Sequence, residues 1–411
     1  MMPDLATRRA RGPRVEPSRR LAWLAVLTFI VSFSSGMTGP VFPLHAQALG
    51  ATYRQVGMVS AAGSVIHAGL AFRAGWLADR LGHNLMFLLS SLAIVLSSVA
   101  YFFSRTLLLA TVGKALDSLF IASYWPALES ASHTAGSAAG HSLGVVYTVY
   151  PVATFAASAA SGWLAGRFGY RASFAAALVG GAAAVAGVAA GLGASKRRSA
   201  GSIGAGRGES GKRRRPRPGL LPGSGTRFAA ALAACFTYCV LVGQALTFGP
   251  LLAEARGLQV ELVGLLVGAF WLGRTAISWP AGVLADRAGY SVVFIPAFIA
   301  GAAGSAIVAS SLAPYGMFAG VALTGLCAGA VAPVAMLLGA ECAEPGSQGW
   351  ALGLCETFCG VGFISSGLVG GVLAGWFGPS APFASGAVVC AAVAAGLALV
   401  FAGGRGKRTG A

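Results

Sequence analysis

The sequence predicts an all-α membrane protein in which twelve transmembrane helices form two pseudo-symmetric bundles of six. Three observations support this fold class: the composition, the number of long apolar stretches, and an internal repeat. Of the 411 residues, 56% are hydrophobic and only 10% are charged, and the mean hydropathy is +0.74. A water-soluble globule of this composition would expose large apolar patches. Most of the chain is therefore expected to lie in a lipid bilayer.

Twelve apolar stretches reach the length of about 20 residues that a helix needs to cross a bilayer. They fall at 21–44, 55–78, 84–103, 106–128, 141–166, 170–194, 227–252, 259–283, 290–310, 313–340, 349–376 and 381–403. The chain then divides into an N-terminal tail, a first bundle, a linker, a second bundle and a C-terminal tail, at 1–20, 21–194, 195–226, 227–403 and 404–411. The linker is rich in Gly, Ser, Arg and Pro, which is typical of a flexible tether.

The second half of the chain repeats the first in register. The string Gly-x-Leu-Ala-Asp-Arg-x-Gly occurs at 75–82 and at 282–289, with its aspartates 207 residues apart (286 − 79). A shortened form, Gly-x-Leu-Ala-Gly, begins at Gly162 and at Gly371, 209 residues apart (371 − 162). Two homologous bundles related by an axis normal to the membrane form one large class of secondary transporters, with the substrate site between them near mid-membrane.

The net charge of +17 is concentrated in the two tails and the linker. Because Lys and Arg are retained on the cytoplasmic face, we expect both termini and the linker to be cytoplasmic in a multi-pass protein of the plasma (inner) membrane. These clusters can hold anionic lipid headgroups, and nucleic acid is not an expected partner. A cleaved signal peptide within 1–36 is the rival interpretation, but its removal would leave eleven spans and break the repeat.

The sequence carries no pattern typical of an enzyme or a metal centre. It has no phosphate-binding loop for ATP and no recognisable nucleophile arrangement, so we expect a protein that is not an enzyme. No Cys/His spacing suited to a metal is present, and we expect neither metal nor cofactor. The seven cysteines are expected to act as small apolar packing residues, and they lie at 235, 239, 327, 342, 355, 359 and 390.

The duplicated string resembles a motif of the major facilitator superfamily. The segment 75–83 resembles that family's loop between helices two and three, and 282–290 resembles its counterpart between helices eight and nine. The resemblance implies a carrier of six plus six helices that works by alternating access. It also implies that Asp79, and its counterpart Asp286, latch the cytoplasmic gate, although both could simply form turns. The residues of this gating motif are Gly75, Asp79, Arg80, Gly82, Gly282, Asp286, Arg287 and Gly289.

Ionisable residues well inside the apolar stretches point to function, because each costs a few kcal/mol or more unless it is paired or faces water. Lys114 and Asp117 are three residues apart in the fourth span and can neutralise each other. Asp117 is either a proton carrier or a cation contact, and Lys114 is either its charge partner or an anion clamp. The structural alternative is a static buried ion pair. The position of Lys114 resembles that of an arginine in helix four of the superfamily.

Two further sites lie at matching positions of the repeat. Glu356 in the eleventh span aligns with Tyr147 and is a candidate for proton coupling or for hydrogen-bonding the solute. Arg274 in the eighth span aligns with His67 in the second. A pairing of Arg274 with Glu356 inside the second bundle is the purely structural alternative.

Aromatic and polar side chains offer a lining for a central cavity. Because the spans contain few Asn and Gln residues, this lining suits an amphiphilic organic solute better than a sugar. The candidates for the lining are Tyr124, Tyr147, Tyr150, Tyr238, Gln244 and Trp271.

The leading functional hypothesis is therefore a monomeric, proton-coupled secondary transporter that exports a small amphiphilic compound. Within the same fold, the alternative is an importer of an organic anion that uses Lys114 and Arg274, or of another nutrient. A different class stays open, namely a membrane sensor or scaffold with a carrier-like fold and no net transport.

Overall fold

The computed structural model describes residues 19–81, 83–133, 139–199, 219–345 and 347–406. In these ranges the first half of the chain forms α1 (Arg19–Gly36), α2 (Val41–Ala48), α3 (Tyr53–Leu81), α4 (His83–Phe103), α5 (Leu107–His133), α6 (Ala139–Phe168) and α7 (Tyr170–Ser199). The second half forms α8 (Gly225–Ala255), α9 (Val260–Ala288), α10 (Tyr290–Ser310), α11 (Pro314–Glu341), α12 (Gln348–Phe377) and α13 (Ala381–Gly406). The prediction of an all-α protein is confirmed.

Helices α1 and α2 together make the first of twelve spans. The chain turns between them at residues 37–40, where Pro40 lacks a backbone N–H and restricts the residue before it. Among the described residues, ten helical stretches are long and apolar enough to cross a membrane, with α1 and α2 counted as one. The other two spans, α3 and α6, lie where the two halves of the chain meet, and polar residues are tolerated at such a position.

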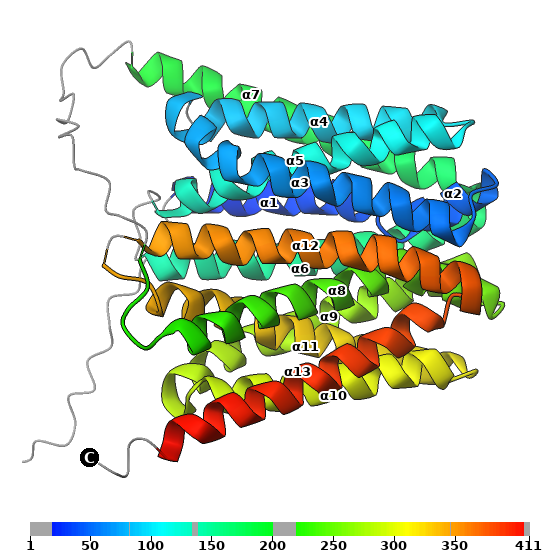
Figure 1. The fold of residues 1–411 in the computed structure, drawn as a ribbon. Helices are drawn as coiled ribbons and strands as arrows, with labels where there is room; N and C mark the ends of the chain where they lie inside the picture. Colours follow the sequence, from blue (N-terminus) through cyan, green and yellow to red (C-terminus); the bar gives the residue numbers. More distant parts are fainter. Residues whose placement is uncertain (1–18, 82, 134–138, 200–218, 346, 407–411) are drawn as a thin grey trace, which may run out of the picture.

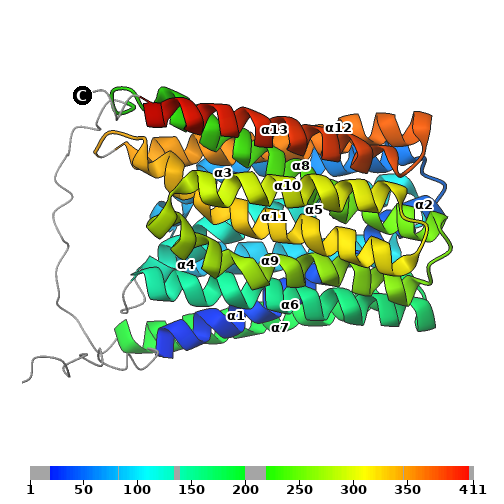
Figure 2. The ribbon, with the colours of Figure 1, turned by 90° about the horizontal axis from the view of Figure 1, so that it is seen from below.

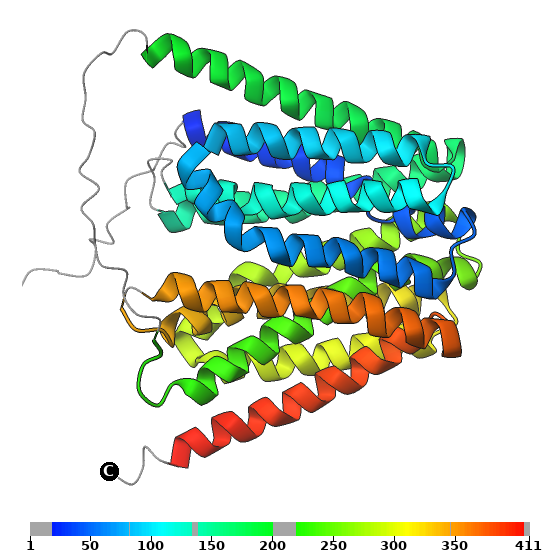
Figure 3. The same cartoon turned by 45° about the horizontal axis from the view of Figure 1, so that its top comes forward.

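The helices form two lobes, with α1–α7 in the first and α8–α13 in the second. In Figure 1, α6 overlaps the second lobe because it packs against α9 where the lobes meet. Two seams join the lobes: α3 packs against α12, and α6 packs against α9. Helix α1 begins, α7 ends, α8 begins and α13 ends at one end of the molecule, which we call the linker end, as Figures 1 and 2 show. We call the opposite end the outer end. Helices α7 and α13 diverge toward the linker end (Figure 3).

Glycines allow the helices inside the second lobe to approach closely. A Cβ atom added to Gly325 of α11 would collide with the backbone carbonyl of Phe270 in α9, and one added to Gly329 would collide with the carbonyl of Arg274. Helices in lipid gain no hydrophobic drive to associate, so such close backbone packing is a main source of their attraction.

A methyl group at this contact should therefore destabilise the protein. We expect Gly325→Ala to reduce the free energy of unfolding by about 1–3 kcal/mol, as overpacking does, and thermal denaturation in detergent checks it. Gly353→Ala is the matched control, because a Cβ there meets open space and alanine is the better helix former. Equal melting temperatures of the two variants would contradict the packing described here.

The end of the linker is attached to the second lobe. Leu220 and Ala343 form an isolated antiparallel bridge. The Leu221 backbone N–H donates to the Cys342 carbonyl at 2.9 Å, and the Glu344 N–H donates to the Gly219 carbonyl at 3.0 Å. Residues 219–221 are thus held against the connection between α11 and α12. The predicted flexible part of the linker falls largely at 200–218, outside the described residues.

Candidate substrate and proton site

A cavity of about 140 Å³ lies between the lobes. The first lobe contributes walls from α1, α2, α3, α5 and α6, and the second from α8 and α9. Sites for drug-sized ligands usually measure about 300–1,000 Å³, so in this conformation the cavity admits only a small solute. Seven serine and threonine side chains line it: Ser32, Ser35, Thr38, Ser60, Thr154, Ser158 and Thr247.

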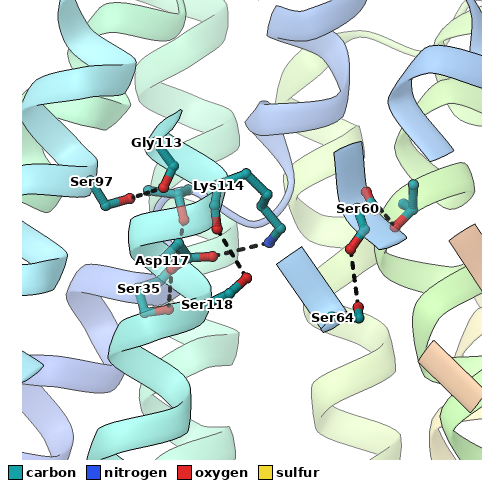
Figure 4. Close-up of polar contacts among 10 residues, drawn as sticks. Ser35, Ser60, Ser64, Ser97, Gly113, Lys114, Asp117 and Ser118 are labelled. Carbon is teal, nitrogen blue, oxygen red and sulfur yellow. Dashed lines mark hydrogen bonds and ion pairs between the residues drawn. The ribbon is translucent and has the colours of Figure 1, made fainter. Parts of the chain in front are cut away.

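The predicted ion pair lies in the wall of this cavity. The Lys114 Nζ is 3.0 Å from the Asp117 Oδ2 (Figure 4), because three residues on α5 bring the two side chains to one face. The other carboxylate oxygen, Oδ1, accepts a long hydrogen bond of 3.5 Å from the Ser35 hydroxyl of α1. The Lys114 Nζ also lies 5.5 Å from the centre of the Phe42 ring, within the range of a cation–π contact.

The two members of the pair differ in the exposure of their side chains. The side chain of Lys114 is 26% exposed, whereas that of Asp117 is 6% exposed. Helix α3 can lie close to α5 because residue 63 is a glycine: a Cβ there would be 2.5 Å from the Ser118 hydroxyl. Both side chains line the cavity, and the carboxylate is the more deeply buried of the two.

An aromatic wall crosses from one lobe to the other beside the ion pair. The ring centres of Trp125 and Tyr150 are 4.7 Å apart, and those of Tyr150 and Trp271 are 5.3 Å apart, both in edge-to-face geometry. Tyr147 adjoins this wall at 5.5 Å from Trp125. The guanidinium of Arg274 lies 5.5 Å from the Trp271 ring. Tyr150 and Trp271 line the cavity, so the aromatic lining expected from the sequence includes these two residues.

Three other predicted lining residues lie away from the cavity. The Tyr124 hydroxyl donates to Thr28 Oγ1 at 3.1 Å in the core of the first lobe. The Tyr238 hydroxyl lies 3.2 Å from the Cys359 Sγ between α8 and α12. The Gln244 amide donates to the Ser385 hydroxyl at 3.5 Å, against α13. The structure thus does not bring these side chains together with Lys114 and Asp117.

The repeat-matched residues lie along the seam between α3 and α12. Glu356 is exposed on α12. His67 of α3 is buried at its Nδ1 atom, which has no hydrogen-bond partner among the described residues. His67 lies within electrostatic reach of Cys359, one helical turn beyond Glu356. Neither Glu356 nor His67 lines the cavity that holds the Lys114–Asp117 pair.

All seven cysteines are buried and none forms a disulfide. Four of them gather between α8 and α12, where Cys235 interacts with Cys355 and Cys359, and Cys239 interacts with Cys359. Within the described part of the chain, no three His, Cys, Asp or Glu side chains are placed to hold a metal ion.

Glycine pairs close both seams toward the outer end. A Cβ on Gly57 of α3 would lie 2.8 Å from the Cα of Gly371 in α12, and one on Gly162 of α6 would lie 2.7 Å from the Cα of Gly264 in α9. Real Cβ atoms are almost never found so close to another heavy atom. Gly57 aligns with Gly264 in the repeat, and Gly162 with Gly371. The same close contact between two glycines therefore closes both seams, because the two halves of the chain repeat the same positions.

A charged residue flanks each glycine pair at equivalent positions of the repeat. The Glu261 carboxylate at the start of α9 lies against Gly166, and the Cβ of Arg54 lies 3.8 Å from the position of a Cβ on Gly375. The shortened repeat motif, which begins at Gly162 and Gly371, supplies both surfaces. The sequence shows these glycines as matched pairs but does not show that they touch across the lobes.

The gating motif is described only in part. In the first copy, Gly75, Asp79 and Arg80 belong to the last turns of α3, but their side chains lie outside the described residues, as does all of Gly82. In the second copy Asp286 and Arg287 are exposed at the end of α9, and a Cβ on Gly282 would meet open space. Gly289 has a φ of +88°, which favours glycine in the turn to α10.

The second motif copy adjoins an ion pair at the linker end. The Arg227 Nη2 is 3.7 Å from the Glu341 Oε2, and the Arg227 guanidinium is 5.7 Å from the Tyr290 ring. Tyr290 also lies within electrostatic reach of Asp286. The latch role that the resemblance implies for Asp79 and Asp286 stays a prediction.

Solved structures of transporters share this fold. The nucleoside transporter NupG, in an aspartate-to-alanine variant, superposes with a TM-score of 0.72 at 14% identity, covering 92% of this chain and 100% of that one. A bacterial homologue of the human lysosomal transporter Spinster, inward-facing and occupied, gives a TM-score of 0.66 at 13% identity, with coverage of 94% and 96%. No curated protein matches the chain. At these identities the likeness shows the fold alone.

The family follows from the sequence itself. The profile of the Major Facilitator Superfamily matches residues 24–261 and again residues 228–410, so it covers nearly the whole chain and both of its halves. The predicted fold of six plus six helices is confirmed. The chain belongs to the Major Facilitator Superfamily, whose members are membrane transporters.

Proposed function

We propose that the protein is a proton-coupled secondary transporter that moves a small amphiphilic organic solute through the cavity between its lobes. The observation that carries this proposal is the Lys114–Asp117 ion pair, which lies in a cavity with walls from both lobes. A solute held there contacts both lobes, as alternating access requires. The hydroxyl groups can bind its polar part, and Tyr150 and Trp271 can pack against its apolar part.

The two glycine seams supply the moving gate. While the pairs Gly57–Gly371 and Gly162–Gly264 are in contact, the seams are closed toward the outer end. If the lobes rock about the cavity, these contacts separate and the solute reaches the outer side. We propose that the linker end is cytoplasmic, because the Lys and Arg clusters lie in the linker and tails, and that the protein resides in the plasma (inner) membrane. Each chain holds both lobes and a whole cavity, which supports action as a monomer.

Protonation of Asp117 is the proposed coupling step. An ionised carboxylate buried in the membrane needs a partner, and Lys114 provides it. When a proton binds Asp117, that charge is cancelled and the lysine ammonium loses its partner. The cavity then changes from neutral to positive, so proton binding alters both the solute affinity and the contacts between α5 and its neighbours.

Glu356 is proposed as a second proton site. It lies on α12, one helical turn from Cys359, which is within electrostatic reach of His67 of α3, at the seam that must open and close. We expect Glu356→Gln to abolish pH-driven flux in proteoliposomes while leaving the fold intact, with the exposed Glu344→Gln as control. Flux equal to that of the unaltered protein would remove Glu356 from the coupling scheme.

The direction of transport depends on how proton and solute share the site. Export against an inward proton gradient, the direction expected from the sequence, requires the two to exclude each other. Uptake requires them to bind together. Proteoliposomes with an internal pH dye and an imposed inward proton gradient distinguish these cases: depletion of solute from the lumen supports export, and accumulation supports uptake. If none of the compounds in a broad panel causes proton movement, the result would instead favour the sensor or scaffold alternative.

A further inference from the structure

We infer that the solute is a small organic anion whose charged group takes the place of the Asp117 carboxylate at Lys114, so that proton and anion travel together. The inference rests on the proposed function and selects uptake over export. It follows from which member of the ion pair is the more exposed, and from the charge that the cavity carries in each protonation state.

The charged side chains that line the cavity, among the described residues, are Lys114 and Asp117. Their charges cancel while both are ionised. Once Asp117 is protonated, the ammonium of Lys114 remains as an uncompensated charge, and the guanidinium of Arg274 lies 5.5 Å from the ring of Trp271, which lines the cavity. A neutral solute would leave the buried ammonium unpaired, which is costly. A cationic solute would be repelled by it, whereas an anion restores the pair.

The geometry also favours binding of an anion at Lys114 over binding of a cation at Asp117. Both side chains line the cavity, but the carboxylate is the more buried member of the pair and the lysine side chain the more exposed one. The ammonium is already held 5.5 Å from the Phe42 ring, so it keeps a supporting contact when the carboxylate releases it. The ammonium is therefore the more accessible of the two charged groups for a solute in the cavity.

An unsatisfied hydroxyl is available to complete the anion site. Ser158 lines the cavity, is 1% exposed, and its Oγ has no hydrogen-bond partner in the described part of the chain. A buried donor without a partner is costly, and an oxygen of a bound anion would satisfy it. Across the lobes, Thr247 and Ser60 are joined by a 3.4 Å hydroxyl contact, which provides further donors.

The remaining groups that face Asp117 do not compensate the charge. From α4, Tyr101 lies within electrostatic reach of the carboxylate, and from α6 so does Tyr150, which also interacts with Arg274. Helices α1 and α3 present Ser35 and Gly63 to this part of α5. Tyrosine hydroxyls are neutral near neutral pH. The charge of the cavity therefore follows the protonation of Asp117.

Binding measurements with matched probes test the inference. The full-length protein in lipid nanodiscs is titrated with acetate, butyrate and phenylacetate, and with the amides and amines of the same shape, at mildly acidic and mildly alkaline pH. We expect at least one anion to bind about tenfold or more tightly at the acidic pH, as a charge-assisted hydrogen bond predicts. Amides and amines should bind more weakly.

Two variants keep the inference testable even if the unaltered protein binds the anion equally at both pH values. Asp117→Asn mimics the protonated acid, so it should bind the anion equally well at both pH values. Lys114→Gln should weaken anion binding by about tenfold or more, and Lys114→Arg should retain it. Preference for an amine or amide, no anion binding by Asp117→Asn, or unchanged binding by Lys114→Gln would each overturn the inference.

The result also separates this inference from the proposed function. If Asp117→Asn binds the anion but still shows pH-driven flux, proton coupling through Asp117 is wrong while the anion site stands. If Asp117→Asn loses pH-driven flux but the cavity prefers an amine, coupling stands and the anion site is wrong.

Discussion

Replacing Asp117 by asparagine is expected to abolish pH-driven solute flux in proteoliposomes, leaving only the background of protein-free vesicles. The variant cannot bind or release a proton at this position, so Lys114 stays without a charged partner throughout the cycle. Asparagine keeps the size of the side chain and can still accept the hydrogen bond that Ser35 donates to the carboxylate. The loss should therefore come from coupling and not from folding.

Two controls accompany that measurement. Melting temperatures of the variant and of the unaltered protein test whether the fold is kept. Solute exchange at equal pH on both sides of the membrane tests whether the lobes still alternate, and we expect this exchange to persist. Full pH-driven flux in Asp117→Asn would mean that the ion pair is static, which was the alternative left open by the sequence.

Gly57→Ala is expected to have the second large effect, because its methyl group cannot fit the closed seam. It would meet the carbonyl of Gly367 and the Cα of Gly371. The outer ends of α3 and α12 must then separate, and the carrier should favour the conformation that is open at the outer end. We expect flux to fall by about tenfold or more, since a shift of about 1.4 kcal/mol in the conformational equilibrium has that effect.

Gly69→Ala on the same helix is the matched control. A Cβ at Gly69 meets open space, and both substitutions bring the same gain in helix propensity of about 1 kcal/mol. A cysteine placed at Ser60 in the cavity wall reports the conformation. It should react faster with a membrane-impermeant thiol reagent from the outer side in Gly57→Ala, while the buried native cysteines react little. Equal behaviour of the two alanine variants would show that the seam does not restrict the closed state.

Much of the fold could be predicted from the sequence because lipid imposes simple rules. A span must be about 20 apolar residues long, and a duplicated motif fixes the register of the two halves. The Lys114–Asp117 pair was also predictable, because spacing on one helix decides which side chains meet. Tyr150 and Trp271 were predicted by a different criterion, because they are aromatic residues inside a span.

Contacts between helices could not be predicted in this way. In a bilayer both faces of a helix are apolar, so the pattern does not reveal its rotation. Tyr124, Tyr238 and Gln244 therefore looked like lining residues, although each faces a neighbouring helix. The glycine seams were missed for a related reason. The repeat aligns Gly57 with Gly264, but their contact partners lie in the opposite lobe.

The central claim is that two lobes rock about the cavity, and pulsed electron paramagnetic resonance tests it most directly. Spin labels at Arg105 and Leu312, both exposed near the outer end, report the outer separation of the lobes. Labels at Arg20 and Gly349, both exposed near the linker end, report the opposite separation. We predict two distance populations for each pair, with pH and bound solute lengthening one distance while shortening the other. A single unchanging distance for both pairs under all conditions would contradict alternating access.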